Sequence, residues 1–159
     1  RIRESVFNIL SARVWDAEVL DLFGGTGAMA LEALSRGAEH AVIVDSGREA
    51  IRAIERNSQS VLKDAMPERV KILRADYRAA IDAMRDVRFD LVFLDPPYRM
   101  ADAYADALTR LCARGLLGEN CICLLERAAD AQISLPDGFE RYDTRTYGGT
   151  SVEFVREAR

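Results

Sequence analysis

Hydrophobic and polar positions follow two alternating patterns along most of the chain. Short, almost continuous apolar runs of strand length fall at about residues 18–23, 40–45, 70–75, 89–95 and 121–126. Longer segments with helical spacing of their apolar positions lie between them, at about residues 27–36, 47–63, 77–84 and 101–114. Strands that alternate with helices predict a parallel sheet whose crossover connections place helices on both faces.

The two ends of the chain depart from this alternation. Residues 1–13 predict an amphipathic N-terminal helix. Its expected apolar face consists of Val6, Phe7, Ile9 and Leu10. Residues 139–147 (FERYDTRTY) and 150–156 (TSVEFVR) predict two strands that Gly148 and Gly149 join into a hairpin. The whole pattern predicts an α/β fold in one domain, residues 1–159, with a central, mostly parallel seven-stranded sheet and a C-terminal antiparallel hairpin.

Length and composition agree with one globular domain. The chain has 159 residues, of which 49% are hydrophobic and 30% charged, and no apolar run approaches the roughly 20 residues of a membrane span. Cys112, Cys121 and Cys123 lack metal-ligand spacing, so we expect reduced thiols in a cytoplasmic protein without a metal site. The net charge of −4 argues against a protein that coats nucleic acid through charge alone, although it permits a local basic patch.

The segment VLDLFGGTGAMALEAL (19–34) places Gly25 and Gly27 between a predicted strand and a predicted helix. Glycine lets the backbone approach a ligand closely, and the N-terminus of a helix offers free N–H groups. Gly25, Gly27 and Ala30 also fit the G-x-G-x-x-G/A spacing of dinucleotide sites, and Asp45 follows Gly25 by 20 residues. The turn therefore predicts a nucleotide-type cofactor, although a tight turn can also require glycines without any ligand.

Three predicted strands end in acids, Asp21, Asp45 and Asp76. The carboxyl ends of parallel strands meet at one edge of a sheet, which is where ligands bind. Asp21 would repel a pyrophosphate but suits a positively charged group, such as the amino group of S-adenosylmethionine. Asp45 would then accept both ribose hydroxyls, and Asp76 the amino group of adenine. Each acid alone could instead cap the helix that follows it.

The fourth predicted strand, at about residues 89–95, leads into the motif Asp95-Pro96-Pro97-Tyr98. The prolines restrict the backbone, so the Asp95 carboxylate and the Pro96 carbonyl become two fixed acceptors. Two acceptors can hold both hydrogens of an exocyclic amino group and direct its lone pair at an electrophilic methyl group. Tyr98 offers a flat face for a flipped or single-stranded base. The alternative is that the Pro-Pro turn only stops the strand and Tyr98 covers its end.

Together, these motifs resemble the amino-group methyltransferases that act on adenine, guanine or cytosine with S-adenosylmethionine. More closely, RIRESVFNIL (1–10), LDLFGGTGAMALEALSRGA (20–38) and FDLVFLDPPY (89–98) resemble the family of bacterial methyltransferases that modify the 2-amino group of a guanine in small-subunit ribosomal RNA. The resemblance covers nearly the whole chain. It implies a Rossmann-like class I methyltransferase fold and S-adenosylmethionine as the cofactor.

The resemblance also implies roles for individual residues. The motif Asp95, Pro96, Pro97 and Tyr98 would hold the target amino group and stack on the guanine. The cofactor would contact Asp21, Phe23, Gly25, Gly27, Asp45 and Asp76, with Ser5, Phe7 and Asn8 near its methionine end. Asp45 stands where relatives often have Glu. The family carries a basic stretch before the Arg-Glu-Ser segment, so an RNA-contacting arm is expected ahead of Arg1.

The partner implied by the resemblance is ribosomal RNA, free or in an assembling small subunit, and the protein would be a monomer without membrane contact. Three alternatives stay open. The first is amino-group methylation of adenine or another base, because the residues do not distinguish the bases or RNA from DNA. The second is a nicotinamide-dependent oxidoreductase, which Asp21 and the lack of a proton relay beyond His40 oppose. The third is a non-catalytic cofactor-binding module, which has no need of the segment 95–98.

Overall fold

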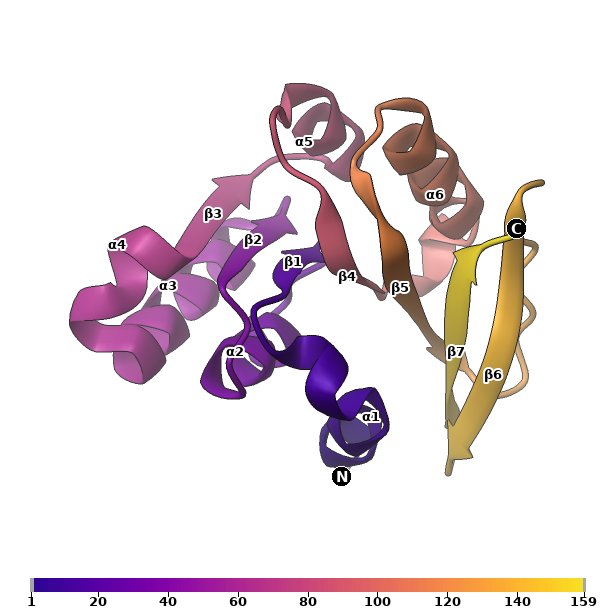
Figure 1. Cartoon of the computed structure of the whole chain (residues 1–159), viewed down its shortest axis with the longest axis horizontal. Coiled ribbons are helices and arrows are strands. Elements are labelled where there is room, and N and C mark those ends of the chain that lie inside the picture. Colours follow the sequence, from indigo (N-terminus) through magenta and orange to yellow (C-terminus); the bar gives the residue numbers. More distant parts are fainter. Residues whose placement is uncertain (1, 159) are drawn as a thin grey trace.

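A seven-stranded sheet forms the centre of the computed structural model, which describes residues 2–158 (Figure 1). The strand order is β3-β2-β1-β4-β5-β7-β6. The first five strands along the chain pair in parallel, whereas β7 lies antiparallel between β5 and β6. The strands are β1 Glu18–Asp21, β2 His40–Asp45, β3 Val70–Arg74, β4 Phe89–Leu94, β5 Leu117–Ala128, β6 Phe139–Tyr147 and β7 Thr150–Glu157. The predicted mostly parallel sheet with its C-terminal hairpin is confirmed.

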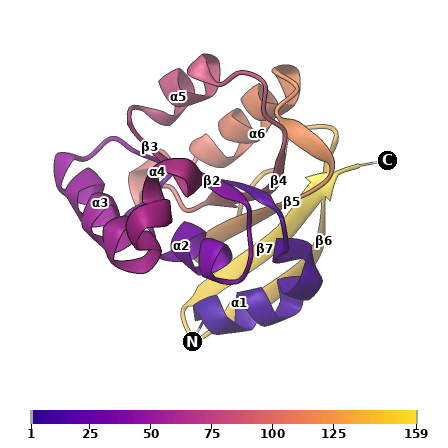
Figure 2. The same cartoon turned by 60° about the vertical axis from the view of Figure 1, so that its left-hand side comes forward.

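Helices cover both faces of this sheet (Figures 1 and 2). Successive residues of a strand point to opposite faces, and in the parallel strands both faces are buried, which explains their continuous apolar sequences. One face packs against α1 (Ile2–Leu10), α2 (Ala28–Ser35) and α3 (Arg48–Leu62). The other packs against α5 (Tyr77–Ala83) and α6 (Ala103–Ala113). Among the described residues, no helix is both long and apolar enough to cross a membrane.

The N-terminal helix differs in two ways from its prediction. It ends at Leu10, and residues 11–14 continue as a 3₁₀ turn. Val6, Phe7 and Leu10 are buried, but Ile9 is 36% exposed, so it does not belong to the packed face. Ile9 neighbours Leu10 in the helix, and a helix turns by about 100° per residue, which carries one of the two away from the sheet.

Two further boundaries were not expected. β5 begins at Leu117 and not near residue 121, because Leu117 pairs with Phe89 before a bulge restores the register at Leu91 and Ile122. The polar residues between these pairs hide the start of the strand from a search for apolar runs. A 3₁₀ turn (Lys63–Ala65) and the short helix α4 (Met66–Arg69) follow α3.

Candidate active site

The glycine turn joins the end of β1 to α2 as predicted. Gly25 and Gly27 have φ angles of +60° and +85°, which side chains strain to adopt, and the Gly27 N–H donates to the Gly24 carbonyl at 2.7 Å. A Cβ on Gly25 would meet nothing within 4 Å, so this residue faces open space that a ligand can approach. Gly24 was not predicted to matter, yet a Cβ there would lie 2.4 Å from Cγ2 of Ile43. Gly24 therefore lets the turn pack directly on β2.

Asp45, at the end of β2, links the glycine turn to β2 through hydrogen bonds. One carboxylate oxygen accepts the Gly25 N–H at 3.0 Å, and the other accepts the Gly47 N–H at 2.8 Å. Each carboxylate oxygen can accept more than one hydrogen bond, so both remain able to receive a ligand hydroxyl. The predicted contact with a ribose is compatible with this geometry and stays a prediction.

Asp76, after β3, caps the helix α5. Its carboxylate accepts the Arg78 backbone N–H at 2.9 Å, and it also pairs with the Arg78 guanidinium through bonds of 2.9 and 3.0 Å. These bonds to Arg78 lower the pKa of Asp76 below its usual value. The capping role that the sequence left open is therefore present. A contact with adenine stays a prediction, and it would have to share the carboxylate with Arg78.

Asp21, at the end of β1, is a buried acid with only 4% of its surface exposed. Its carboxylate accepts the Phe23 N–H at 3.1 Å. Burial raises the pKa of Asp21 to about 7, and the nearby charges of Asp95 and Asp45 act in the same direction. A cation placed beside this carboxyl group would favour its charged form. A contact of Asp21 with the ammonium group of S-adenosylmethionine stays a prediction.

A cavity of about 420 Å³ lies at the carboxyl ends of the strands, and we call it the first cavity. It brings together residues from four separate segments of the chain. Its lining includes Phe23, Asp45, Asp76, Asp95 and Tyr98. Three of the predicted cofactor residues thus share one cavity with the predicted target motif, whereas Asp21, Gly25 and Gly27 do not line it. The roles of all these residues stay predictions.

The residues of α1 that were predicted to lie near the methionine end are placed differently from one another. Phe7 is 1% exposed, and its ring packs 5.9 Å from that of Phe93, with the Arg36 guanidinium 5.3 Å from its centroid. Asn8 is exposed and Ser5 half-buried. None of the three lines the first cavity. Phe7 is thus part of the core here, and a contact of these residues with the cofactor stays a prediction.

The segment Asp95-Pro96-Pro97-Tyr98 leaves β4 as a compact turn. Pro96 is buried, and the Pro97 carbonyl accepts the Met100 N–H at 2.8 Å. The Tyr98 side chain is 97% exposed. A ring that covered the end of the strand would be largely buried, so the alternative role for Tyr98 is not supported. The ring instead presents free aromatic faces at the cavity.

Glu126 was not predicted as a site residue, yet it lies beside Asp95. β4 and β5 pair in parallel with Leu94 opposite Leu125, so the next residue on each strand is an acid. The two carboxyl groups are close enough for each to affect the pKa of the other. Burial and the charge of Asp95 raise the pKa of Glu126 to about 7. The signal in the sequence was the same as for Asp95, an acid directly after the apolar run CICLL.

Comparison with known proteins places the chain among its relatives. Residues 1–156 match the family described as Conserved hypothetical protein 95. The chain belongs to this family. Ribosomal RNA small subunit methyltransferase D of Escherichia coli K12 is 32% identical over 161 residues, which span 100% of this chain and 78% of that protein. The protein of the same name from Haemophilus influenzae is 28% identical over 156 residues, spanning 98% of this chain and 80% of its own length.

The solved structures agree with this family. A conserved hypothetical protein from Streptococcus pyogenes superposes with a TM-score of 0.85 at 31% identity, covering 96% of this chain and 93% of that one. The class I methyltransferase fold and S-adenosylmethionine as the cofactor of this methyltransferase family are both confirmed. The family is therefore one of methyltransferases and not of nicotinamide-dependent oxidoreductases.

Proposed function

We propose that the protein transfers a methyl group from S-adenosylmethionine to the 2-amino group of a guanine in small-subunit ribosomal RNA. One observation carries this proposal. Asp95, Pro96, Pro97 and Tyr98 line the first cavity and also a second cavity of about 350 Å³ on the side of β5. A cofactor in the first cavity and a base in the second would meet at this segment, which supplies the orientation that the reaction needs.

The chemistry follows from the acceptors of the segment. S-adenosylmethionine supplies an electrophilic methyl group attached to a positively charged sulfur. The Asp95 carboxylate and the Pro96 carbonyl would accept the two amino hydrogens, so that the nitrogen lone pair points at the methyl carbon. Transfer of the methyl group to the nitrogen would leave the electrons of the carbon–sulfur bond on sulfur. The amino group then releases one proton, and the Asp95 carboxylate is the charged acceptor beside it.

Tyr98 would hold the base by stacking. Its ring is 97% exposed at a position that borders both cavities. Stacking of a nucleobase on an aromatic side chain contributes about 1–3 kcal/mol. An exposed tyrosine between two cavities therefore supports an extruded or single-stranded base as the substrate.

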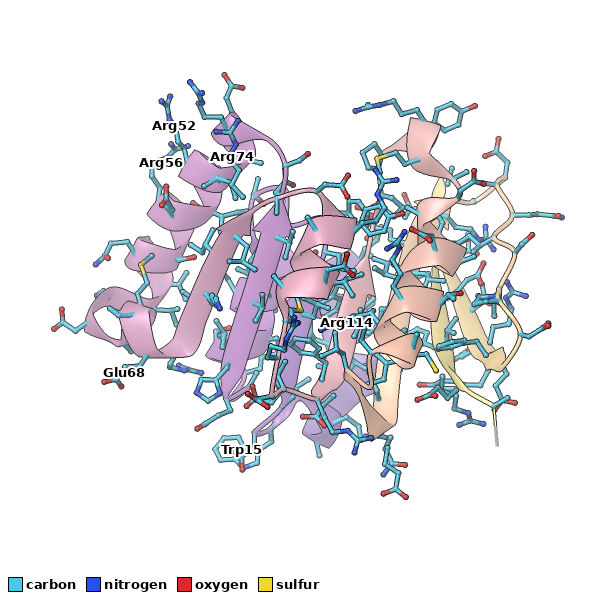
Figure 3. The ribbon with its side chains drawn as sticks, turned by 90° about the horizontal axis from the view of Figure 1, so that it is seen from above. Trp15, Arg52, Arg56, Glu68, Arg74 and Arg114 are labelled. Carbon is cyan, nitrogen blue, oxygen red and sulfur yellow. The ribbon has the colours of Figure 1, made fainter. Side chains whose placement is uncertain are left out.

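Three arginines at one end of the molecule support contact with RNA phosphates, and one of them, Arg74, contacts a residue that lines the first cavity. Figure 3 shows Arg52 and Arg56 of α3 together with Arg74 at one end of the molecule, while Trp15 and Glu68 lie at the other end. The Arg74 guanidinium donates to the carbonyl of Ser46, a residue that lines the first cavity, at 3.4 Å. Positive side chains that follow a backbone of phosphates supply sequence-independent affinity.

The proposal is tested by identifying the methylated nucleoside. Small-subunit ribosomal RNA, free and assembled into particles, is incubated with the protein and S-adenosylmethionine that carries a labelled methyl group, and the RNA is then digested to nucleosides. We expect the label on the 2-amino group of guanosine, with no label when Asp95→Ala replaces the wild type. Label on adenosine would show another base as the target, and absence of label from both forms of RNA would contradict the proposal.

A further inference from the structure

The second cavity is enclosed by elements that the cofactor does not need. Its lining includes Tyr104 of α6, Glu126 at the end of β5, Ile133 in the following loop and Thr150 at the hairpin. Asp95 and Tyr98 form its boundary with the first cavity. A planar base that stacks on Tyr98 and offers its amino group to Asp95 would therefore have the Glu126 carboxyl group as a neighbour along its hydrogen-bonding edge.

The surroundings of Glu126 fix its position without neutralising it. The Tyr104 hydroxyl donates to the Glu126 backbone carbonyl at 2.5 Å, which ties this residue to α6. Arg127, the next residue, does not balance its charge, because the Arg127 guanidinium pairs with the buried Glu153 at 2.5 Å and donates to the carbonyls of Ala128 and Ala129. Asp95 and Glu126 are thus two adjacent acids that share one cavity.

Two adjacent carboxylates match guanine and not adenine. The edge of guanine presents the 2-amino group and the N1–H side by side, so neighbouring acceptors can receive both donors. In adenine the ring nitrogen beside the amino group is an acceptor, and a carboxylate opposite it would be left unpaired. A site that hydrogen-bonds one substrate strongly rejects an analogue that leaves its polar groups unpaired.

Resting on the proposed function, we propose that Glu126 determines base specificity: its carboxylate accepts the N1–H of the target guanine while Asp95 accepts from the 2-amino group. Glu126 would then touch the substrate and act as more than a support for Asp95. A purely structural role predicts that a change at residue 126 lowers activity equally for every base. The specificity role predicts that the loss depends on the group at position 1 of the base.

The test pairs one change in the enzyme with one change in the base. Small-subunit ribosomal RNA is prepared with guanine or 2-aminopurine at the nucleotide that the mapping experiment identifies. 2-Aminopurine keeps the reacting amino group but has an acceptor in place of the N1–H. The kcat/KM values for both RNAs are measured with the wild type and with Glu126→Gln, whose amide can donate to that acceptor. The control is Glu140→Gln, which changes a partly exposed acid of β6 that pairs with Arg156.

We expect the wild type and Glu140→Gln to prefer guanine by at least about tenfold, and Glu126→Gln to reduce this preference below about threefold. An unchanged preference in a folded Glu126→Gln that binds S-adenosylmethionine normally would overturn the inference. The wild type alone can also overturn the inference. Equal methylation of both bases would show that no group of the protein recognises the N1–H. If the wild type methylates neither RNA, the proposed function fails and not merely the role of Glu126.

Discussion

The acids on the proposed cofactor side of the site and those on its proposed substrate side are held in different ways. Asp45 receives two backbone N–H groups, and Asp76 receives a backbone N–H and the guanidinium of Arg78. Asp95 and Glu126 instead face each other, and the pKa of each carboxyl group is raised because the surrounding protein disfavours its charged form. Asp21 is the exception on the cofactor side, since burial raises its pKa to about 7.

This difference separates two uses of a carboxylate. An acid that already has donors is fixed before any ligand arrives, so it supplies shape and orientation at little further cost. An acid that lacks donors gains more from a ligand that brings them, because the ligand relieves an unfavourable charge. Asp45 and Asp76 belong to the first kind, whereas Asp95 and Glu126 belong to the second. Asp21 shares features of both, because it accepts the Phe23 N–H and yet has a raised pKa.

The largest expected effect comes from Asp95. We expect Asp95→Ala to lower the single-turnover methylation rate at least about 100-fold, because the amino group loses the acceptor that orients it. The affinity for S-adenosylmethionine, measured by calorimetry, should stay within about twofold. Asp102→Ala, which changes an exposed acid nearby, serves as the control. A large loss of cofactor affinity in Asp95→Ala would assign this acid to the cofactor side and remove the contrast between the two groups.

Tyr98 tests whether the substrate side receives a planar base. Tyr98→Ala should weaken the interaction with RNA by about 1–3 kcal/mol, which is roughly 5- to 150-fold in kcat/KM. Tyr98→Phe should keep most of the activity, since the stacking face survives. Thermal unfolding should hardly change in either variant, because the ring is 97% exposed. An equal loss of kcat/KM in both variants would show that Tyr98 acts through its hydroxyl group and not by stacking.

We expect Asp21 to make the affinity for S-adenosylmethionine depend on pH. The ammonium group of S-adenosylmethionine favours ionised Asp21, so the affinity should rise several-fold between pH 6.0 and 7.5, across the pKa of about 7. Asp21→Asn should bind more weakly and show little change over this range. Calorimetric titrations at both pH values measure the effect. Equal wild-type affinities would mean that Asp21 does not contact the charged group.

The same pKa fixes the sign of a stability effect in the ligand-free protein. Native Asp21 holds its proton more tightly than the unfolded chain does, so the free energy of unfolding should fall as pH rises from about 4 to 7. In Asp21→Asn, the free energy of unfolding should lack this part of its dependence on pH.

The smallest expected effect concerns the arginines. Arg52→Gln should weaken RNA binding a few-fold and reduce the slope of log affinity against log salt by roughly 0.7, the value for one contact with single-stranded nucleic acid. Arg114→Gln removes the same charge from another part of the surface, which Figure 3 shows away from Arg52, and should leave the slope unchanged. Equal slopes for the two variants would exclude a local contact at Arg52. Filter binding over a range of salt concentrations provides the measurement.

The fold could be predicted because parallel strands are buried on both faces. Such strands appear in the sequence as short apolar runs between segments of helical periodicity. Leu91 to Leu94 are an example, since all four are buried. The start of β5 could not be predicted in this way. Glu119 and Asn120 interrupt its apolar pattern, and only the pairing of Leu117 with Phe89 extends the strand past them.

The site was predictable where chemistry follows directly from local sequence. Asp45, Asp95 and the glycines stand at strand ends that the pattern locates. Glu126 was missed because its importance depends on which strand lies beside β4, and strand order is not written in either strand alone. Asp76 was found, but its role could not be predicted. An acid directly after β3 is expected both for a cap of α5 and for a contact with a ligand, so the sequence does not separate the two roles.

The order of the strands bears on how the protein is made. β7 lies between β5 and β6 but follows every other strand in the chain, so one edge of β5 stays open during synthesis until residues 150–157 have left the ribosome. Glu126 pairs with Val152 in that last strand. Domains fold as units while chains grow at about 5–20 residues per second, and open strand edges invite wrong partners meanwhile. Thr150, which lines the second cavity, therefore joins the fold late, and a nascent chain lacks part of the proposed substrate cavity until its translation has passed β7.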